Sequence, residues 1–497
     1  MTDTAHYALI ILFASAVGLV AVLANRLTER VKIPAPLLVL TGAALAANTL
    51  PALHPPPEQM VERIITVALV LVLFDGGMHI GWSRFRAAAV PIVSVGVVGT
   101  FLTAAGAAVV LHVGFGIPWY LAVLVATAVA PTDPAVVFSV LGRREIAGRS
   151  GTILEGESGA NDPVGIALMS SLIAAGGLSA AGFATVGIEF ALQMVVGGLI
   201  GAVGGRLLLA FMRRVPLPSE GLYPLRTLAV SLMLYGIATL AHGSGFLAVF
   251  VAGVVIGDAG APYKREVARF HSALAGLAEI VAFAVLGVTV DLRVLAQVEV
   301  WLPGVVLGLA LTVIVRPLAV GTCLAPVKVR RNERAFILFA GLKGAVPILL
   351  GEFLRAAHVP QAERFYGIVV VVVAFSVLVQ GSLVPVVARV LNLPMRTAEP
   401  EPWAMGVRLR DEPEGVRRLT VRPGSAAEGT AIADLGEHVG DIWVSIVVRE
   451  SRLIPVRADS ELQAGDEVVI LAEPEADDAL DELFAAAKEP NQNGDSA

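Results

Sequence analysis

The segment Glu155–Pro163 contains three polar side chains with the spacing of one helix face. Ser158, Asn161 and Asp162 follow the pattern i, i+3, i+4, so a helix places them together. A hydroxyl, an amide and a carboxylate provide the oxygen ligands that hard cations prefer. Asp162 can also bind a proton, so that a cation and a proton would compete for one group. The pattern predicts a site where a monovalent cation and H⁺ alternate; a hydrogen-bonded patch between helices is the alternative.

A second group of oxygen atoms is expected in the segment Ala130-Pro131-Thr132-Asp133-Pro134. Two prolines remove two backbone N–H donors, so the helix that contains them must break here. Asp133 then stands at the N-cap of the second half, with Pro134 at its first position. Carbonyl oxygens freed beside the Thr132 hydroxyl could bind a bare cation. A proline kink without a ligand role is the alternative.

The segment Gly341-Leu-Lys-Gly-Ala-Val-Pro347 predicts a second interrupted helix. Lys343 is expected to close its first half, where a positive charge suits the negative end of the helix dipole. The two interrupted helices lie seven predicted spans apart and therefore run in opposite directions. This arrangement indicates inverted repeats with a site at the membrane midplane.

Glu157 and Arg316 are the remaining charges near these motifs. At about 100° per residue, Glu157 points roughly 140° away from Asp162 and therefore towards a neighbouring helix. Arg316 lies within the apolar run Leu311–Leu324, and neither charge is tolerated unpaired inside a membrane. We therefore expect these two side chains to form an ion pair.

The composition indicates which elements position these groups. Of 497 residues, 56% are apolar and only 16% are charged, with a mean hydropathy of +0.77. A soluble chain carries roughly 25% charged residues. Apolar runs long enough to cross a bilayer predict an all-α polytopic membrane domain of thirteen transmembrane helices over residues 1–393. The single cysteine, Cys323, excludes a disulfide framework and a thiolate metal site.

Basic residues indicate the orientation of these helices. Lys and Arg are concentrated in every second connection between the apolar runs and are sparse in the others. Because basic loops stay on the cytoplasmic side, the N-terminus is expected in the periplasm and the C-terminus in the cytoplasm of a bacterial inner membrane. The first apolar run has no cleavage motif and is expected to be a span rather than a signal peptide.

The character of the chain changes after residue 393. Residues 394–402 are typical of a proline-containing linker, and 403–487 predict a small α+β domain. Its strands are expected at Val416–Val421, Ile442–Val448 and Glu467–Leu471, followed by a helix at Asp477–Ala487 and a disordered tail at 488–497. A glycine-rich phosphate loop is missing from the sequence, which argues against a dinucleotide fold and against an ATP-driven enzyme.

Taken with Phe74-Asp-Gly-Gly77, these motifs resemble a monovalent cation:proton antiporter of the first superfamily branch, NhaP type. The likeness covers the chain to about Leu391. Residues 403–487 resemble the C-terminal half of potassium-regulatory RCK domains (TrkA-C). Antiporters of this type with such a domain are similar to potassium/proton antiporters, with transported K⁺ or Na⁺ and H⁺ as substrates and no cofactor.

The resemblance implies an elevator-type homodimer with Asp162 as the main carrier of cation and proton. It implies that Ser158, Thr132 and Asp75 help to coordinate the cation, directly or through water, although a structural carboxylate is the alternative for Asp75. Asn161 stands where electrogenic relatives have a second aspartate, so exchange is expected to be electroneutral. The resemblance further implies a structural ion bridge between Glu157 and Arg316, and compensation of half-helix charges by Asp133 and Lys343. The family more often has arginine at the position of Lys343.

Other function classes fit the sequence less well. A channel would need a lined pore or a carbonyl filter, and a transporter of organic solutes would need more aromatic and amide groups around its site. A Na⁺-selective antiporter with the same core, or a Kef-like ligand-gated K⁺ efflux system, remains an alternative. The expected partners are membrane lipid, a second copy of the chain and a small ligand or ion at the C-terminal domain, with no nucleic acid. We expect Glu189, Arg226 and Glu279 to form interhelical pairs or to lie on a dimer face.

Overall fold

The computed structural model describes two compact units, Met1–Trp403 and Ala404–Ala497. The described residues are 35–50, 55–134, 137, 141, 144–146, 149–393, 395–397, 416–436, 442–449, 452–472 and 476–485, with isolated positions 15, 18 and 19. The first predicted span, the disordered tail and most of the second half of the first interrupted helix lie outside these residues.

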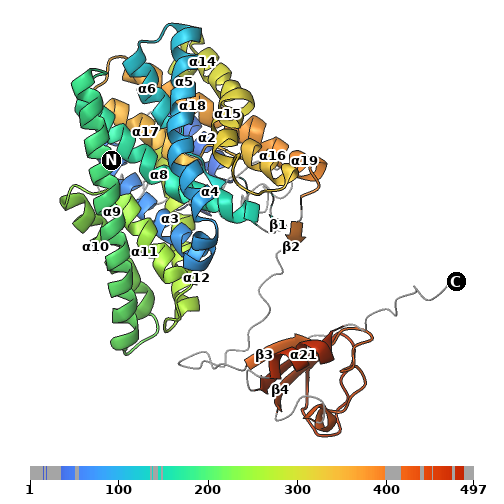
Figure 1. The fold of residues 1–497 in the computed structure, drawn as a ribbon. Helices are drawn as coiled ribbons and strands as arrows, with labels where there is room; N and C mark the ends of the chain where they lie inside the picture. The colour runs from blue at the N-terminus through green and yellow to red at the C-terminus, as the bar shows by residue number, and fades with distance from the viewer. Residues whose placement is uncertain are drawn as a thin grey trace, which may run out of the picture. The chain divides into compact units, whose positions relative to one another are not determined.

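The first unit is mostly helical, as the apolar runs predict (Figure 1). Seven of its described helices are long and apolar enough to cross a membrane, and three shorter apolar helices accompany them. The total of thirteen spans and the inverted repeats stay predictions. The helices are α2 (Ala35–Thr49), α3 (Glu58–Ala87), α4 (Ala89–Val93), α5 (Thr100–Phe115), α6 (Trp119–Ala128), α8 (Arg149–Ala175), α9 (Ala180–Arg214), α10 (Leu222–Leu240), α11 (Gly245–Gly257), α12 (Lys264–Val288), α13 (Leu292–Leu295), α14 (Val298–Ala310), α15 (Arg316–Leu324), α16 (Arg331–Phe339), α17 (Ala345–Ala356), α18 (Ala362–Phe375) and α19 (Ser382–Val390).

Three of the long apolar segments contain a π-helical turn that the sequence did not predict. These turns are η1 (Ser94–Gly99), η2 (Leu311–Val315) and η3 (Ser376–Gly381), and each continues directly into an α-helix on both sides. A π turn inserts one extra residue into the helix and frequently occurs at functional sites. Here η2 precedes Arg316, and η3 carries buried polar side chains.

Glycines permit close contact between α3 and α11 in the membrane unit (Figure 1). A Cβ atom on Gly77 would lie 2.4 Å from the Phe250 carbonyl oxygen, and one on Gly253 would lie 2.4 Å from that of Phe74. Small residues are the usual means by which membrane helices approach this closely. The contact places the Phe250 ring directly over Gly159 of α8, where a Cβ atom would overlap it.

The described part of the second unit contains a four-stranded antiparallel sheet of order β3-β6-β4-β5 and the helix α21 (Asp477–Phe484). The three predicted strands are present as β3 (Val416–Thr420), β4 (Ile442–Arg449) and β6 (Glu467–Ala472). The sequence analysis missed the short strand β5 (Arg452–Ile454). The helix α21 (Asp477–Phe484) contributes three buried residues to the core and ends before the predicted Ala487.

The predicted linker begins with a paired strand rather than with free chain. Strand β2 (Met395–Thr397) pairs antiparallel with β1 (Arg144–Ile146) of the membrane unit. The prolines that favoured a linker stand at 400 and 402, so the backbone donors of 395–397 remain available for pairing. The bounds of the linker, 394–402, stay a prediction, and its residues 395–397 are paired with the membrane unit.

Candidate functional site

Both predicted helix interruptions are present. The helix α6 ends at Ala128, residues 129–133 are not helical, and helical structure resumes at Pro134. The helix α16 ends at Phe339, and α17 begins only at Ala345, so five residues between them are not helical. Each interruption exposes backbone carbonyl or N–H groups at the end of a half-helix.

The two interruptions contact each other through backbone and side chains. The Asp133 N–H donates to the Leu342 carbonyl at 2.8 Å. The Asp133 carboxylate lies over Gly344, where a Cβ atom would be 1.9 Å from Oδ2. Gly344 is the N-cap of α17, so this negative charge lies at the positive end of that helix. Only a glycine leaves room for it there.

Lys343 compensates the other interrupted helix rather than its own. Its ammonium group donates to the Ala130 carbonyl at 2.9 Å and to the Pro131 carbonyl at 3.1 Å. These carbonyls follow the C-terminal end of α6, where the helix dipole is negative. The expectation that Lys343 closes the first half of its own helix is wrong, because α16 stops four residues earlier, at Phe339. Asp133 of the first interruption thus lies at the end of α17, and Lys343 of the second interruption lies at the end of α6.

The first interruption is joined to α8 by a chain of hydrogen bonds. The Asn161 amide Nδ2 donates to the Thr132 hydroxyl at 2.8 Å, and that hydroxyl donates to Glu157 Oε1 at 3.3 Å. Ser158 and Asp162 lie one turn apart on the same helix, and both are buried. The structure therefore brings Thr132 together with the predicted polar face of α8.

Two buried acceptor oxygens on this face accept no hydrogen bond from the described residues. They are Asp162 Oδ1 and the amide oxygen Asn161 Oδ1. Buried acceptors in native proteins almost always have a donor, an ordered water or an ion as a partner. Two adjacent acceptors without a donor, beside a hydroxyl and a broken helix, form a set of oxygens that fits a dehydrated monovalent cation. A proton on Asp162 would satisfy the same carboxylate in its absence.

Glu157 and Arg316 lie together, as expected from the sequence. Arg316 Nη1 is 2.6 Å from Glu157 Oε1 and Nη2 is 3.0 Å from Oε2, a bidentate geometry. The side chains are only 5% and 2% exposed. Arg316 also donates to the carbonyls of Leu338 and Ile337, each at 3.1 Å, in the last turn of α16. Gly341 makes room for the guanidinium, because its Cβ atom would be 2.0 Å from Arg316 Nε.

The Asp75 carboxylate contacts Ser272 and His79 rather than the polar face of α8. It accepts a hydrogen bond from Ser272 of α12 at 3.0 Å and lies 3.3 Å from the imidazole of His79. Among the residues that the structure describes, no hydrogen bond joins Asp75 to Thr132, Ser158 or Asp162. These contacts favour the alternative of a structural carboxylate over direct ligation.

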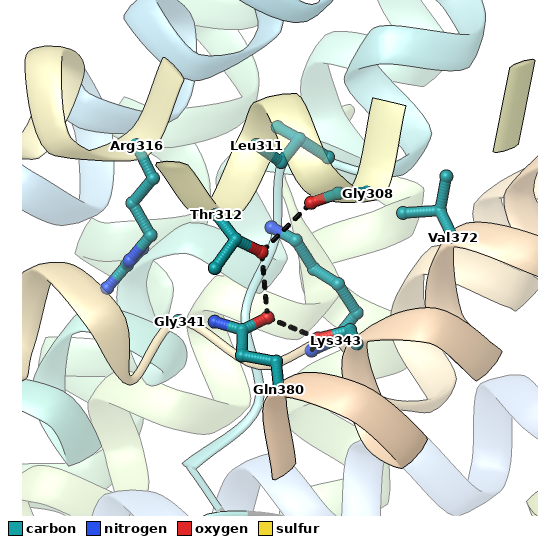
Figure 2. A pocket seen from close by; sticks show the side chains of 9 residues that line it. Gly308, Leu311, Thr312, Arg316, Gly341, Lys343, Val372 and Gln380 are labelled. Atoms are coloured by element: carbon teal, nitrogen blue, oxygen red, sulfur yellow. Dashed lines mark hydrogen bonds between the residues drawn. The ribbon is translucent and has the colours of Figure 1, made fainter. Parts of the chain in front are cut away.

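Sequence reasoning missed a polar network beside the second interruption. Thr312, Ser376 and Gln380 border a small pocket together with Arg316 and Lys343 (Figure 2). An amide and a hydroxyl within an apolar run are the signal that could have identified them. Arg226, by contrast, donates to the Val215 carbonyl at 2.8 Å and lies over two aromatic rings. Among the described residues it has no acidic partner, so the interhelical ion pair, one of its two predicted roles, is not seen there.

Comparisons with known proteins agree with this arrangement. Residues 15–390 match the family model for the transmembrane domain of sodium/hydrogen exchangers, and 416–485 match that for the TrkA-C domain. The chain is 34% identical to the K⁺/H⁺ antiporter NhaP of Alkalimonas amylolytica over 78% of this chain and 67% of that protein. It is 30% identical to the K⁺/H⁺ antiporter NhaP2 of Shewanella oneidensis over 95% and 83% of the two chains.

A cyanobacterial relative and a solved structure extend the comparison. The chain is 30% identical to the Na⁺/H⁺ antiporter NhaS2 of Synechocystis over 58% of this chain and 51% of that protein. The solved structure of the sodium proton antiporter MjNhaP1 from Methanocaldococcus jannaschii has the same fold. It superimposes with a TM-score of 0.66, at 19% identity, over 78% of this chain and 99% of that one.

Proposed function

This chain belongs to the sodium/hydrogen exchanger family and carries a TrkA-C domain, and from that premise we propose that it exchanges K⁺ or Na⁺ for H⁺. The observation that carries the proposal is the pair of buried oxygens Asp162 Oδ1 and Asn161 Oδ1 beside the broken helix α6, which accept no hydrogen bond from the part of the chain that the structure describes. Relatives named K⁺/H⁺ antiporters match nearly the whole chain, which favours K⁺. A Na⁺-selective antiporter with the same core is the second candidate, because a relative named for Na⁺ also matches.

In the proposed mechanism, cation and proton occupy Asp162 in turn. The cation binds the Asp162 carboxylate with oxygens of Ser158 and Thr132, and Asp75 acts through water. Protonation of Asp162 removes the charge that holds the cation and releases it on the opposite side of the membrane. Because Asn161 carries no charge, one proton replaces one cation and exchange is electroneutral. The exchanged countercharges of Asp133 and Lys343 keep both broken helix ends neutral in either state.

The transport cycle that we propose is of the elevator type, in a homodimer in a bacterial inner membrane. The N-terminus would lie in the periplasm and the TrkA-C domain in the cytoplasm, where a small ligand or ion would set the activity. Exchange would serve cation and pH homeostasis. A Kef-like ligand-gated efflux system is disfavoured because the sequence has no nucleotide-binding half before the TrkA-C domain.

Cation-dependent proton flux in everted membrane vesicles tests this function. Vesicles from a host that lacks its own antiporters are energised, and the collapse of the pH gradient is recorded after K⁺, Na⁺ or Li⁺ is added. We expect collapse with K⁺ or Na⁺ and none with Asp162→Asn. Ser171→Ala is the matched control, since the Ser171 hydroxyl bonds only within its own helix. A well-inserted wild-type protein that responds to no monovalent cation would refute the proposal.

A further inference from the structure

Gln380 is a buried amide in a mostly apolar candidate transmembrane segment. It belongs to the π turn η3 and is 4% exposed, and Ser376 in the same turn is 2% exposed. A polar group in this environment is expensive unless hydrogen bonds satisfy it, and intramembrane polar residues usually serve function. Neither side chain touches the oxygens around Asp162 that the proposed exchange uses.

The hydrogen bonds of Gln380 connect the two sides of the second helix interruption. Its Nε2 donates to the carbonyl of Phe339, the last residue of α16, at 2.5 Å. Its Oε1 accepts from the Ser376 hydroxyl at 2.9 Å and from the Thr312 hydroxyl at 3.3 Å. Ser376 in turn accepts the backbone N–H of Lys343 at 3.0 Å. Figure 2 shows the hydrogen bond between Thr312 and Gln380, with the Lys343 side chain beside both residues.

These contacts satisfy backbone groups that the interruption leaves without helical partners. A helix end orphans its last carbonyls, and here Gln380 binds that of Phe339 while Arg316 binds those of Leu338 and Ile337. The Lys343 N–H would also be unpaired without Ser376. The five non-helical residues are therefore held at both ends by side chains from η3 and α15.

The interruption held in this way positions the groups around the cation. Its Leu342 carbonyl accepts the Asp133 N–H, and its Lys343 ammonium binds the Ala130 and Pro131 carbonyls. Thr132 lies between those residues. A shift of the second interruption would therefore move the Thr132 hydroxyl relative to α8.

We propose that Gln380, acting with Ser376, is a positioning residue for cation exchange. It sets the place of the second interruption and, through Lys343 and Leu342, the geometry of the oxygen atoms at Thr132. The inference rests on the proposed function and adds a determinant of cation affinity that does not touch the cation. Removing the amide should weaken cation binding while the protein still inserts and turns over.

The test compares Gln380→Met, which keeps the length of the side chain, with Ser376→Ala, their double variant and the control Ser171→Ala. Half-saturating cation concentration and maximal rate are measured in everted vesicles, with the amount inserted and the melting temperature in detergent recorded for each. We expect each single variant to raise the half-saturating concentration about fivefold to tenfold. The double variant should add little, because both changes break one network.

Several results would overturn the inference. One is an unchanged half-saturating concentration in both single variants with normal insertion; another is the same change in Ser171→Ala. A loss confined to maximal rate and proportional to the amount inserted would show a merely structural role. If Gln380→Met does not insert into the membrane, the half-saturating concentration of Ser376→Ala alone decides whether the inference holds. A wild-type protein without exchange would refute the proposed function and this inference with it, whereas an active wild type with unaffected variants refutes only the inference.

Discussion

The pair Glu157–Arg316 provides the most quantitative prediction, tested with Glu157→Gln, Arg316→Leu and the double variant. Both side chains are almost fully buried, with two charge-assisted hydrogen bonds between them. Removing one partner of such a pair leaves an uncompensated buried charge and destabilises by about 3–5 kcal/mol. A guanidinium cannot lose its proton, so Glu157→Gln leaves a charge that has only two carbonyl oxygens as further acceptors.

We expect Arg316→Leu to lower the free energy of unfolding more than Glu157→Gln does. The double variant should recover only part of the loss. Arg316→Leu removes the partner of Glu157 and also the donors to the Leu338 and Ile337 carbonyls. Each buried acceptor left without a donor costs about 1–3 kcal/mol. The double variant removes both charges but still leaves these two carbonyls unpaired, so we expect a residual loss of about 2–6 kcal/mol. The sum of the single losses should exceed this by several kcal/mol.

The free energy of unfolding can be measured by SDS titration of detergent-solubilised protein, followed by tryptophan fluorescence. Cation selectivity of the double variant should match that of the wild type, since neither residue carries the cation. If the loss in free energy of unfolding of the double variant equalled the sum of the two single losses, the two side chains would not act as a pair. A Glu157→Gln loss larger than that of Arg316→Leu would contradict the part assigned to the two carbonyls.

Further predictions concern the carrier, the stoichiometry and the C-terminal domain. Asp162→Asn should abolish exchange, and residual flux above a few per cent of wild type would exclude Asp162 as the carrier. In proteoliposomes, dissipating the membrane potential should leave the steady-state cation gradient unchanged, and a changed gradient would contradict electroneutral exchange. Truncation after Thr397 keeps strand β2 and should leave exchange measurable while its cation or pH threshold shifts; complete loss in an inserted protein would contradict a regulatory role. Burial raises the pKa of Asp466, but hydrogen bonds from Arg449 and a backbone N–H outweigh it and hold the pKa below its ordinary value. The pair therefore stabilises the domain above pH ~4, and this stabilisation is lost as the pH falls through the lowered pKa. The melting temperature of the isolated domain should fall with decreasing pH in this range. It should fall less steeply in Arg449→Ala.

Local chemistry was enough to predict the interruptions and the polar face. Prolines at 131 and 134 remove N–H donors from their own helix, and the segment from Gly341 to Pro347 combines two glycines with a proline, so both segments favour a break. The spacing of Ser158, Asn161 and Asp162 depends only on helix periodicity. Short strand-like runs separated by turn residues were likewise enough to place three strands of the C-terminal domain.

Contacts between distant parts of the chain were decided by packing. Lys343 binds a carbonyl 213 residues away rather than its own half-helix, since the gap after Phe339 moves it beside α6. The Asp75 carboxylate accepts a hydrogen bond from Ser272, 197 residues away, which the sequence did not indicate. The π turn η3 and the amide of Gln380 had no pattern that pointed to the break they hold. Periodicity and proline effects act within a few residues, whereas the partner of a buried charge depends on which helices lie beside it, and only the folded chain determines that.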